Sequence, residues 1–198
     1  MQVFLLRHAE AFKNLRDTHG GTGSSLTALG IAQIAEVSVE LQSHTIDAIY
    51  YIDRQQCKDT ALLIGGCLGI KPTVATNISP YHLGIADGIS HSEFRQRDPA
   101  AASRMDAWRA GTLEIGDLRL PGAEDPIVFY KRGTTFLEWL ARNMQNDAVL
   151  IATRSVLVLL WNIFLGRTPH KGGGYKEVPW GNCEMQTVDW PPECQNDR

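Results

Sequence analysis

The stretch Leu5-Leu6-Arg7-His8-Ala9-Glu10 carries the clearest signal in this sequence. The continuous apolar run 3–6 is typical of a strand buried on both faces, and it ends abruptly in an arginine and a histidine. A strand with this ending brings a guanidinium that binds anions and an imidazole that can act as a nucleophile to the same pocket. Because short motifs also match by chance, the rest of the chain has to support this interpretation.

Strand and helix patterns alternate along the 198 residues. A Gly-rich loop is expected at 10–25; strands are expected at 46–51, 72–75, 148–153 and 184–189, and helices at 27–42 (capped by Thr27), 54–69, from Asp125 onward and at 155–165. This alternation predicts an α/β fold, a three-layer α/β/α sandwich with a mostly parallel sheet whose last strand lies at the edge. We expect one domain over 1–198, with an irregular insertion at about 77–121 that covers a cleft and a loosely ordered tail from Pro191.

The composition argues against several classes of function. The formal net charge is −3 and the pI is about 6.1, so no basic surface indicates nucleic acid binding. The four cysteines are scattered and form no C-x-x-C pair, which argues against a disulfide framework or a zinc site and favours reduced thiols in the cytoplasm. The longest apolar stretch, 156–165, is too short to span a bilayer, and no signal peptide or membrane partner is expected. The oligomeric state is left open, with a dimer as one option.

Two polar dipeptides lie at the carboxyl ends of predicted strands. Ligands of parallel α/β sheets bind beyond the carboxyl ends of the strands, where Arg7-His8 and Thr153-Arg154 both lie, so these residues are expected to meet in one pocket. Transfer of a phosphoryl group requires cations around its three equatorial oxygens. A neutral imidazole can attack phosphorus, and an arginine can clamp two of the oxygens. The pattern is therefore consistent with a small anionic, phosphorylated substrate.

A series of motifs continues from this opening. Asn14 follows the histidine by six residues, and Leu26-Thr27-Ala28-Leu29-Gly30 with Gln33 comes next. Weaker motifs lie at 59–61 (Asp-Thr-Ala), 83–88 (Leu-Gly, then Asp-Gly), 121–124 (Pro-Gly-Ala-Glu) and 148–153. In this order they resemble the motifs of the histidine phosphatase superfamily, with its phosphoglycerate mutase-like fold, over nearly the whole chain. The opening motif is fairly specific to this family. The later motifs are weak one by one, but they support the resemblance because they occur in the same order as in the family.

The resemblance implies a role for several residues. His8 would accept the phosphoryl group as a phosphohistidine, with Arg7 as a phosphate ligand and Asn14 as a polar contact near the phosphate. His82, in the segment that resembles the active-site loop, is a further candidate for contact with the substrate. The chemistry requires no metal and no organic cofactor, and the spacing of His82 and His91 fits no standard metal site.

The leaving group needs a proton from an acid. Asp87 is the first choice, with Glu10 and Glu124 as alternatives, and a carboxyl has to be kept protonated by burial to serve in this way. Many members of the family have a glutamate four residues before the glycine that matches Gly84, whereas this chain has Pro80.

Two further positions depart from the family pattern. Arg154 stands in place of the family's second histidine; it can hold phosphate, but it cannot act as a general base because it does not deprotonate. Gln56 stands where the family has its other pocket arginine. Arg54 is nearby and is a candidate for binding the substrate, although on a helix it is expected to point elsewhere.

Three functions follow from these features. The leading hypothesis is a phosphomonoester hydrolase or phosphoryl transferase that acts on a small phosphorylated metabolite through a phosphohistidine at His8. Arg154 and Gln56 support an alternative, a non-catalytic anion-binding protein descended from such enzymes. A third option is a different enzyme on this scaffold, with His8 as acid or base on an anionic substrate. The identity of the substrate is not encoded in any pattern that we recognise.

Overall fold

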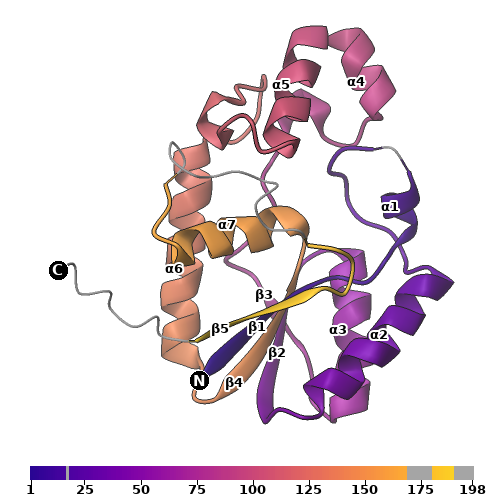
Figure 1. Cartoon of the computed structure of the whole chain (residues 1–198), viewed down its shortest axis with the longest axis vertical. Coiled ribbons are helices and arrows are strands. Elements are labelled where there is room, and N and C mark those ends of the chain that lie inside the picture. The colour runs from indigo at the N-terminus through magenta and orange to yellow at the C-terminus, as the bar shows by residue number, and fades with distance from the viewer. Residues whose placement is uncertain (17, 169–179, 190–198) are drawn as a thin grey trace.

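A mixed sheet lies at the centre of the computed structural model, which describes residues 1–16, 18–168 and 180–189 (Figure 1). The strands are β1 (Gln2–Arg7), β2 (Ile46–Ile52), β3 (Thr73–Ala75), β4 (Asp147–Ala152) and β5 (Met185–Asp189), in the order β3-β2-β4-β1-β5. The first four strands are parallel, and β5 pairs antiparallel with β1 at the edge. The mostly parallel α/β sheet that the sequence predicted is confirmed.

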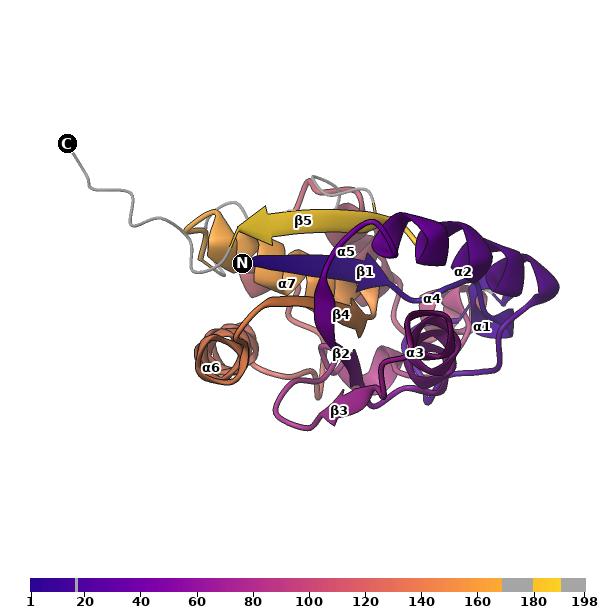
Figure 2. The same ribbon diagram turned by 90° about the horizontal axis from the view of Figure 1, so that it is seen from below.

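Helices cover both faces of the sheet, as Figure 1 and Figure 2 show. α2 (Ala28–Leu41) and α3 (Gln55–Leu68) lie on one side, and α6 (Pro126–Asn143) and α7 (Arg154–Phe164) lie on the other. Thr27 Oγ1 accepts a hydrogen bond from the N–H of Gly30 at 3.0 Å, and Asp125 Oδ1 accepts one from the N–H of Ile127 at 2.8 Å. These caps satisfy N–H groups that have no partner within the helix, so they define where α2 and α6 begin.

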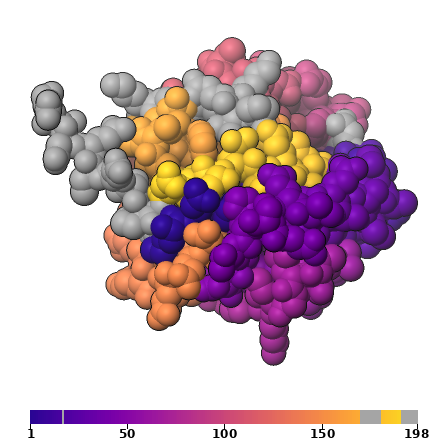
Figure 3. All heavy atoms as spheres, turned by 60° about the horizontal axis from the view of Figure 1, so that its bottom comes forward, coloured from indigo at the N-terminus to yellow at the C-terminus, as the bar shows by residue number. Residues whose placement is uncertain are grey.

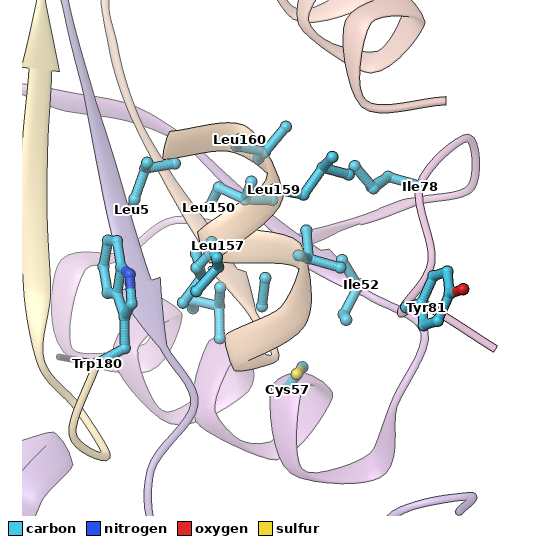
Figure 4. Close-up of a cluster of buried hydrophobic side chains, with 14 of the residues drawn as sticks. Leu5, Ile52, Cys57, Ile78, Tyr81, Leu150, Leu157, Leu159, Leu160 and Trp180 are labelled. Carbon is cyan, nitrogen blue, oxygen red and sulfur yellow. The ribbon is translucent and has the colours of Figure 1, made fainter. Parts of the chain in front are cut away.

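The core lies between the helical layers and the sheet. The apolar runs of β1 and β4 pass through it, and Leu5 and Leu150 are at most 1 % exposed. Figure 4 shows these two leucines beside Leu157 of α7, which is also fully buried. Each such side chain stabilises the fold by roughly 1.5–3 kcal/mol relative to an exposed position. Burial on both faces explains why β1 and β4 are continuously apolar in the sequence.

Residues just before β5 hold the end of β1. Figure 3 shows β5 at the surface, as expected for an edge strand. The N–H of Cys183 donates to the carbonyl of Arg7 at 3.2 Å, and the N–H of Arg7 donates to the carbonyl of Glu184 at 3.0 Å. The point where β1 ends is therefore fixed by a segment at the opposite end of the sequence.

The segment 77–121 lies beyond the carboxyl ends of the parallel strands (Figure 1). It contains α4 (His91–Arg97), α5 (Pro99–Arg109) and the short 3₁₀ helices η1 (Gly84–Ala86) and η2 (Ile115–Asp117). Gly84 has φ of +58°, and a Cβ on it would lie 2.2 Å from the carbonyl oxygen of Pro121. No residue other than glycine fits this close approach, which ties the loop at 82–84 to the loop at 121–123.

One short helix was not expected. α1 (Phe12–Leu15) lies within 10–25, where the Gly-rich sequence predicted a loop throughout. The prediction was wrong here because a side chain organises the turn: Asn14 Oδ1 accepts a hydrogen bond from the N–H of Ala11 at 2.9 Å. The tail from Pro191, expected to be loosely ordered, lies outside the described residues.

Candidate active site

The carboxyl ends of β1 and β4 lie side by side. Arg7 pairs with Ala152 in the sheet register, and the N–H of His8 donates to the carbonyl of Ala152 at 3.1 Å. Neighbouring strands are about 4.8 Å apart, so residues that follow these two strands are close in space. The sheet therefore brings His8 and Arg154 to the same edge, as the sequence predicted.

His8 is buried and held in one orientation. It is 3 % exposed, and its Nδ1 lies 2.8 Å from the carbonyl oxygen of Ala9. Because a carbonyl can only accept, Nδ1 carries the proton and Nε2 keeps a lone pair. The N–H of Ala9 donates to Thr60 Oγ1 at 3.1 Å, which fixes the backbone beside the imidazole.

The charge state of His8 follows from its surroundings. Burial, with smaller contributions from the Arg7 and Lys13 cations, lowers the pKa of His8 from 6.5 to about 3, although the hydrogen bond to Ala9 acts in the opposite direction. The imidazole is therefore neutral near pH 7. A neutral imidazole with a free Nε2 lone pair is the form that can act as a nucleophile.

A pocket of about 380 Å³ opens beyond the strand ends. All the site residues that the sequence singled out line it, namely Arg7, His8, Asn14, Arg54, His82, Asp87 and Arg154. The expectation that Arg54 points elsewhere was wrong. Arg54 is not inside α3 but is its N-cap residue, with extended backbone angles (φ −144°, ψ 138°), and this position lets it line the pocket.

Arg7, Arg154 and the start of α7 are among the positively charged groups of the pocket. The Arg7 guanidinium donates to the carbonyl of Trp180, a contact that anchors this side chain from the segment before β5. Arg154 is the first residue of α7, and Thr153, Arg154 and Ser155 all line the pocket. The first N–H groups of a helix have no acceptor within the helix and carry the positive end of its dipole. The start of α7 is thus suited to hold an anion.

Asn14 lines the pocket, and its amide oxygen is occupied by two donors. Its Oδ1 accepts hydrogen bonds from the N–H of Ala11 at 2.9 Å and from Asn182 Nδ2 at 3.4 Å. Two donors on the same atom assign the orientation of the amide, so Nδ2 is left to donate to a ligand. Asn182 also donates to the carbonyl of His8 at 3.0 Å. Sequence patterns did not indicate Asn182, because it approaches the site from the other end of the chain.

The three candidate acids lie in different surroundings. Asp87 lines the pocket, and its Oδ1 accepts a hydrogen bond from the N–H of Gly21 at 2.9 Å. Glu124 also lines the pocket, but both of its oxygens accept from the Arg132 guanidinium. Glu10 is not among the residues that line the pocket, and its Oε1 accepts from Thr27 Oγ1 at 2.7 Å.

Gln56 stands behind the wall of the pocket and does not line it. It is fully buried, and its Oε1 accepts a hydrogen bond from the N–H of Ser24 at 3.4 Å. Its Nε2 has no hydrogen-bond partner among the described residues. The position that resembles the family's second pocket arginine therefore supplies no cation here.

Several residues that the sequence did not single out also line the pocket, namely Lys13, Tyr81, Trp108, Arg109 and Arg132. Lys13 directly precedes Asn14, and this adjacency could have suggested it. The other four lie on the 77–121 segment and on α6, and no local pattern marks them.

The part of the chain that the structure describes contains neither a cluster of metal ligands nor a membrane-spanning helix. In that part, no three His, Cys, Asp or Glu side chains are grouped so that they could hold a metal ion. Over the same residues, no helix combines the length and the apolar character that crossing a membrane would require.

Comparisons with known proteins agree with the motifs. The chain is 24% identical to a metal-independent phosphoserine phosphatase of Arabidopsis thaliana over 156 residues, which are 77% of this chain and 63% of that protein, less than two thirds of its length. It is 24% identical to a probable phosphoglycerate mutase, GpmB, of Proteus mirabilis (strain HI4320) over 194 residues, 96% of this chain and 85% of that protein. The solved structure of Bacillus stearothermophilus YhfR has the same fold, with a TM-score of 0.80 at 22% identity over 95% of this chain and 90% of that chain.

The family assignment rests on a match to nearly the whole sequence. The model of the histidine phosphatase superfamily (branch 1) matches residues 3–196. This range contains His8, β1 except for its first residue, the residues that line the pocket, and β4, the late strand that precedes Arg154. The resemblance inferred from the motifs is confirmed, and the chain belongs to the histidine phosphatase superfamily.

Proposed function

We propose that this protein is a phosphomonoester hydrolase, or a phosphoryl transferase, that acts on a small phosphorylated metabolite through a phosphohistidine at His8. The observation that carries the proposal is the state of His8. It is a neutral imidazole whose Nδ1 is bound to the Ala9 carbonyl, with its Nε2 lone pair left for attack, and it shares its pocket with Arg7 and Arg154.

The first step forms the covalent intermediate. Nε2 of His8 attacks phosphorus, the bond between phosphorus and the ester oxygen breaks, and the ester oxygen leaves with a proton from Asp87. Arg7, Arg154 and the N–H groups at the start of α7 hold the equatorial oxygens, while Asn14 Nδ2 donates to one of them. These donors are in place before the reaction, so they stabilise the transition state without reorganising.

The second step releases the product. Water gives a proton to Asp87 and attacks the phosphohistidine, the phosphorus–nitrogen bond breaks, and inorganic phosphate leaves with neutral His8 restored. In a transferase, the hydroxyl of an acceptor takes the place of water. We assign the role of acid and base to Asp87 because it lines the pocket and uses only one oxygen in a hydrogen bond. Its side chain is exposed in the structure without a ligand, so the burial that such an acid needs would have to come from the bound substrate. Glu124 is less suited because it is paired with Arg132.

Hydrolysis of 4-nitrophenyl phosphate, together with trapping of the phosphoenzyme, tests the proposal. We expect turnover and an acid-labile, base-stable phosphoenzyme, and we expect His8→Ala to lower kcat by several orders of magnitude and to abolish the intermediate. His44→Ala removes an exposed histidine that does not line the pocket, and it serves as the control. Turnover of His8→Ala close to that of the unmodified protein would refute the role of His8.

A non-catalytic anion-binding protein is the second candidate. Arg154 in place of the family's second histidine and Gln56 in place of its other pocket arginine favour this function. It predicts that inorganic phosphate binds in calorimetric titrations while no ester is hydrolysed. The third hypothesis, His8 as acid or base in a different reaction, is less favoured because a pKa of about 3 leaves the imidazole without a second proton to donate near pH 7 and makes it a weak base.

We further propose that the protein works in the cytoplasm. The described cysteines Cys57, Cys67 and Cys183 are free thiols, the form that a reducing compartment preserves. The option of a dimer stays a prediction, which light scattering of the purified protein would test.

A further inference from the structure

Residues 180–184 form a tight turn directly before β5, here called the 180–184 turn. Its first residue, Trp180, is 2 % exposed, and Figure 4 shows this side chain within the core. The N–H of Glu184 donates to the carbonyl of Gly181 at 3.1 Å and closes the turn. Cys183 has φ of +56°, a backbone conformation that a residue with a side chain adopts only where its surroundings hold it. The turn is therefore fixed in one conformation.

The backbone of the 180–184 turn is enough to attach it to β1. The N–H of Cys183 donates to the carbonyl of Arg7 at 3.2 Å, and the N–H of Arg7 donates to the carbonyl of Glu184 at 3.0 Å. The Arg7 guanidinium also donates to the carbonyl of Trp180. Because these bonds already hold the turn in place, the side chain of Asn182 is not needed for that purpose.

The Asn182 amide instead joins two residues of the pocket. Its Nδ2 atom donates to the carbonyl of His8 at 3.0 Å and to Asn14 Oδ1 at 3.4 Å. An amide nitrogen carries two hydrogens, so one atom can serve both acceptors. Asn182 is not among the described residues that line the pocket. Any effect that it has on a ligand therefore passes through His8 and Asn14.

The bond to His8 completes a clamp on one peptide group. That peptide consists of the His8 carbonyl, which accepts from Asn182, and the Ala9 N–H, which donates to Thr60 Oγ1 at 3.1 Å. The carbonyl of Ala9, next along the chain, accepts from Nδ1 of the His8 imidazole at 2.8 Å. Rotation of the clamped peptide would move this carbonyl, and the imidazole with it. The direction of Nε2 thus depends on Asn182 and Thr60 together.

We propose that Asn182 is a positioning residue for the reaction at His8. Its amide holds both the peptide group after His8 and the amide of Asn14, so that His8 Nε2 and Asn14 Nδ2 are directed at the same phosphoryl group. The inference rests on the proposed function, in which His8 attacks and Asn14 donates. Attack on phosphorus requires in-line geometry, and a displacement of about 1 Å can lower the rate about 100-fold. Asn182 then contributes to the rate without touching the substrate.

Asn182→Leu tests this role, because leucine has nearly the shape of asparagine but no donor. With 4-nitrophenyl phosphate, we expect kcat to fall at least about tenfold while KM changes less than about threefold, since the proposed phosphate ligands Arg7 and Arg154 are unchanged. Asn143→Leu is the matched control: Asn143 is exposed at the end of α6, donates to a backbone carbonyl and does not line the pocket. A kcat of Asn182→Leu within about twofold of that of the unmodified protein would overturn the proposal.

A double-mutant cycle with Asn14→Ala tests the link between the two asparagines. If Asn182 sets the direction of the Asn14 amide, both substitutions remove the same contact. Asn14→Ala should then lower kcat/KM at least about tenfold in the unmodified protein but less than about threefold in Asn182→Leu. Losses that multiply would overturn the link. If the leucine variant does not fold, Asn182→Asp gives the same comparison, because its carboxylate keeps the size of the amide but only accepts hydrogen bonds.

An NMR measurement separates this inference from the proposed function. The nitrogen chemical shifts of the imidazole report which nitrogen carries the proton, and the His8 signals are those that disappear in His8→Gln. We expect the Nδ1–H form in the unmodified protein and in Asn143→Leu, but a mixture of both forms in Asn182→Leu, because the Ala9 carbonyl is no longer held. A mixture in this variant, with no turnover by the unmodified protein, would refute the phosphatase function and support the positioning of His8. A single, unchanged form in Asn182→Leu would overturn the positioning of His8 even if the ester is hydrolysed.

Discussion

Replacing His8 with glutamine should remove a measurable part of the acid sensitivity of this protein. Burial lowers the pKa of His8 from 6.5 to about 3 in the folded state, whereas the unfolded chain keeps a value near 6.5. As the pH falls below about 6.5, His8 takes up a proton in the unfolded chain but stays neutral in the folded protein. The free energy of unfolding therefore decreases with acidification, and this contribution ends near pH 3, where the folded state also becomes protonated.

The magnitude follows from the two pKa values. One unit of difference in pKa corresponds to about 1.4 kcal/mol, so the proton taken up by the unfolded chain lowers the free energy of unfolding by about 2 kcal/mol between pH 8 and pH 5, and by about 3 kcal/mol at pH 4. The His8→Gln variant lacks this contribution. The chain has six histidines, and the other five are present in both proteins, so their effects cancel in the comparison.

Urea denaturation of both proteins at pH 8 and pH 5 measures the difference. The relevant quantity is the change in the free energy of unfolding between the two pH values, which should be about 2 kcal/mol smaller for His8→Gln. The slope of the free energy against urea concentration has to be the same in all titrations, because a change in slope would indicate a different extent of unfolding. If both proteins lose the same stability on acidification, His8 titrates normally, and the argument for a buried neutral nucleophile fails.

Three further substitutions probe other parts of the site. Arg154→Met should lower kcat/KM for 4-nitrophenyl phosphate about 100-fold in steady-state assays, because the guanidinium that we propose as the clamp for two phosphate oxygens is lost; an unchanged value would exclude contact with the phosphate. Arg132→Met should lower the free energy of unfolding by roughly 2 kcal/mol in urea titrations, because the side chains of Arg132 and its partner Glu124 are only 25% and 13% exposed. Arg95→Met should lower it by less than about 1 kcal/mol, because Arg95 and its partner Asp106 are 61% and 49% exposed. Equal losses of stability in the two variants would contradict this ranking. Gly84→Ala should lower the melting temperature far more than Gly88→Ala, because both glycines have positive φ but only at Gly84 would a Cβ lie 2.2 Å from a backbone oxygen; similar melting temperatures would show that this loop adjusts.

Local sequence patterns were sufficient to predict the strands and helix starts that position the site. The apolar runs that form β1 and β4 predicted buried parallel strands, because a strand covered on both faces shows no polar alternation. Thr27 and Asp125 indicated where helices begin, since capping depends on residues within one turn. The placement of His8 beside Arg154 was also predictable, because neighbouring parallel strands end at the same edge of a sheet.

Only the tertiary structure decided the chemical state and the neighbours of these groups. The pKa of His8 depends on burial by distant elements, and the direction of Arg54 depends on the residue at which α3 begins. The hydrogen bond from Asn182 to the carbonyl of His8 joins opposite ends of the chain. Propensity and periodicity describe interactions between near neighbours in the sequence, whereas burial and charge in a pocket depend on distances between residues that only folding brings together.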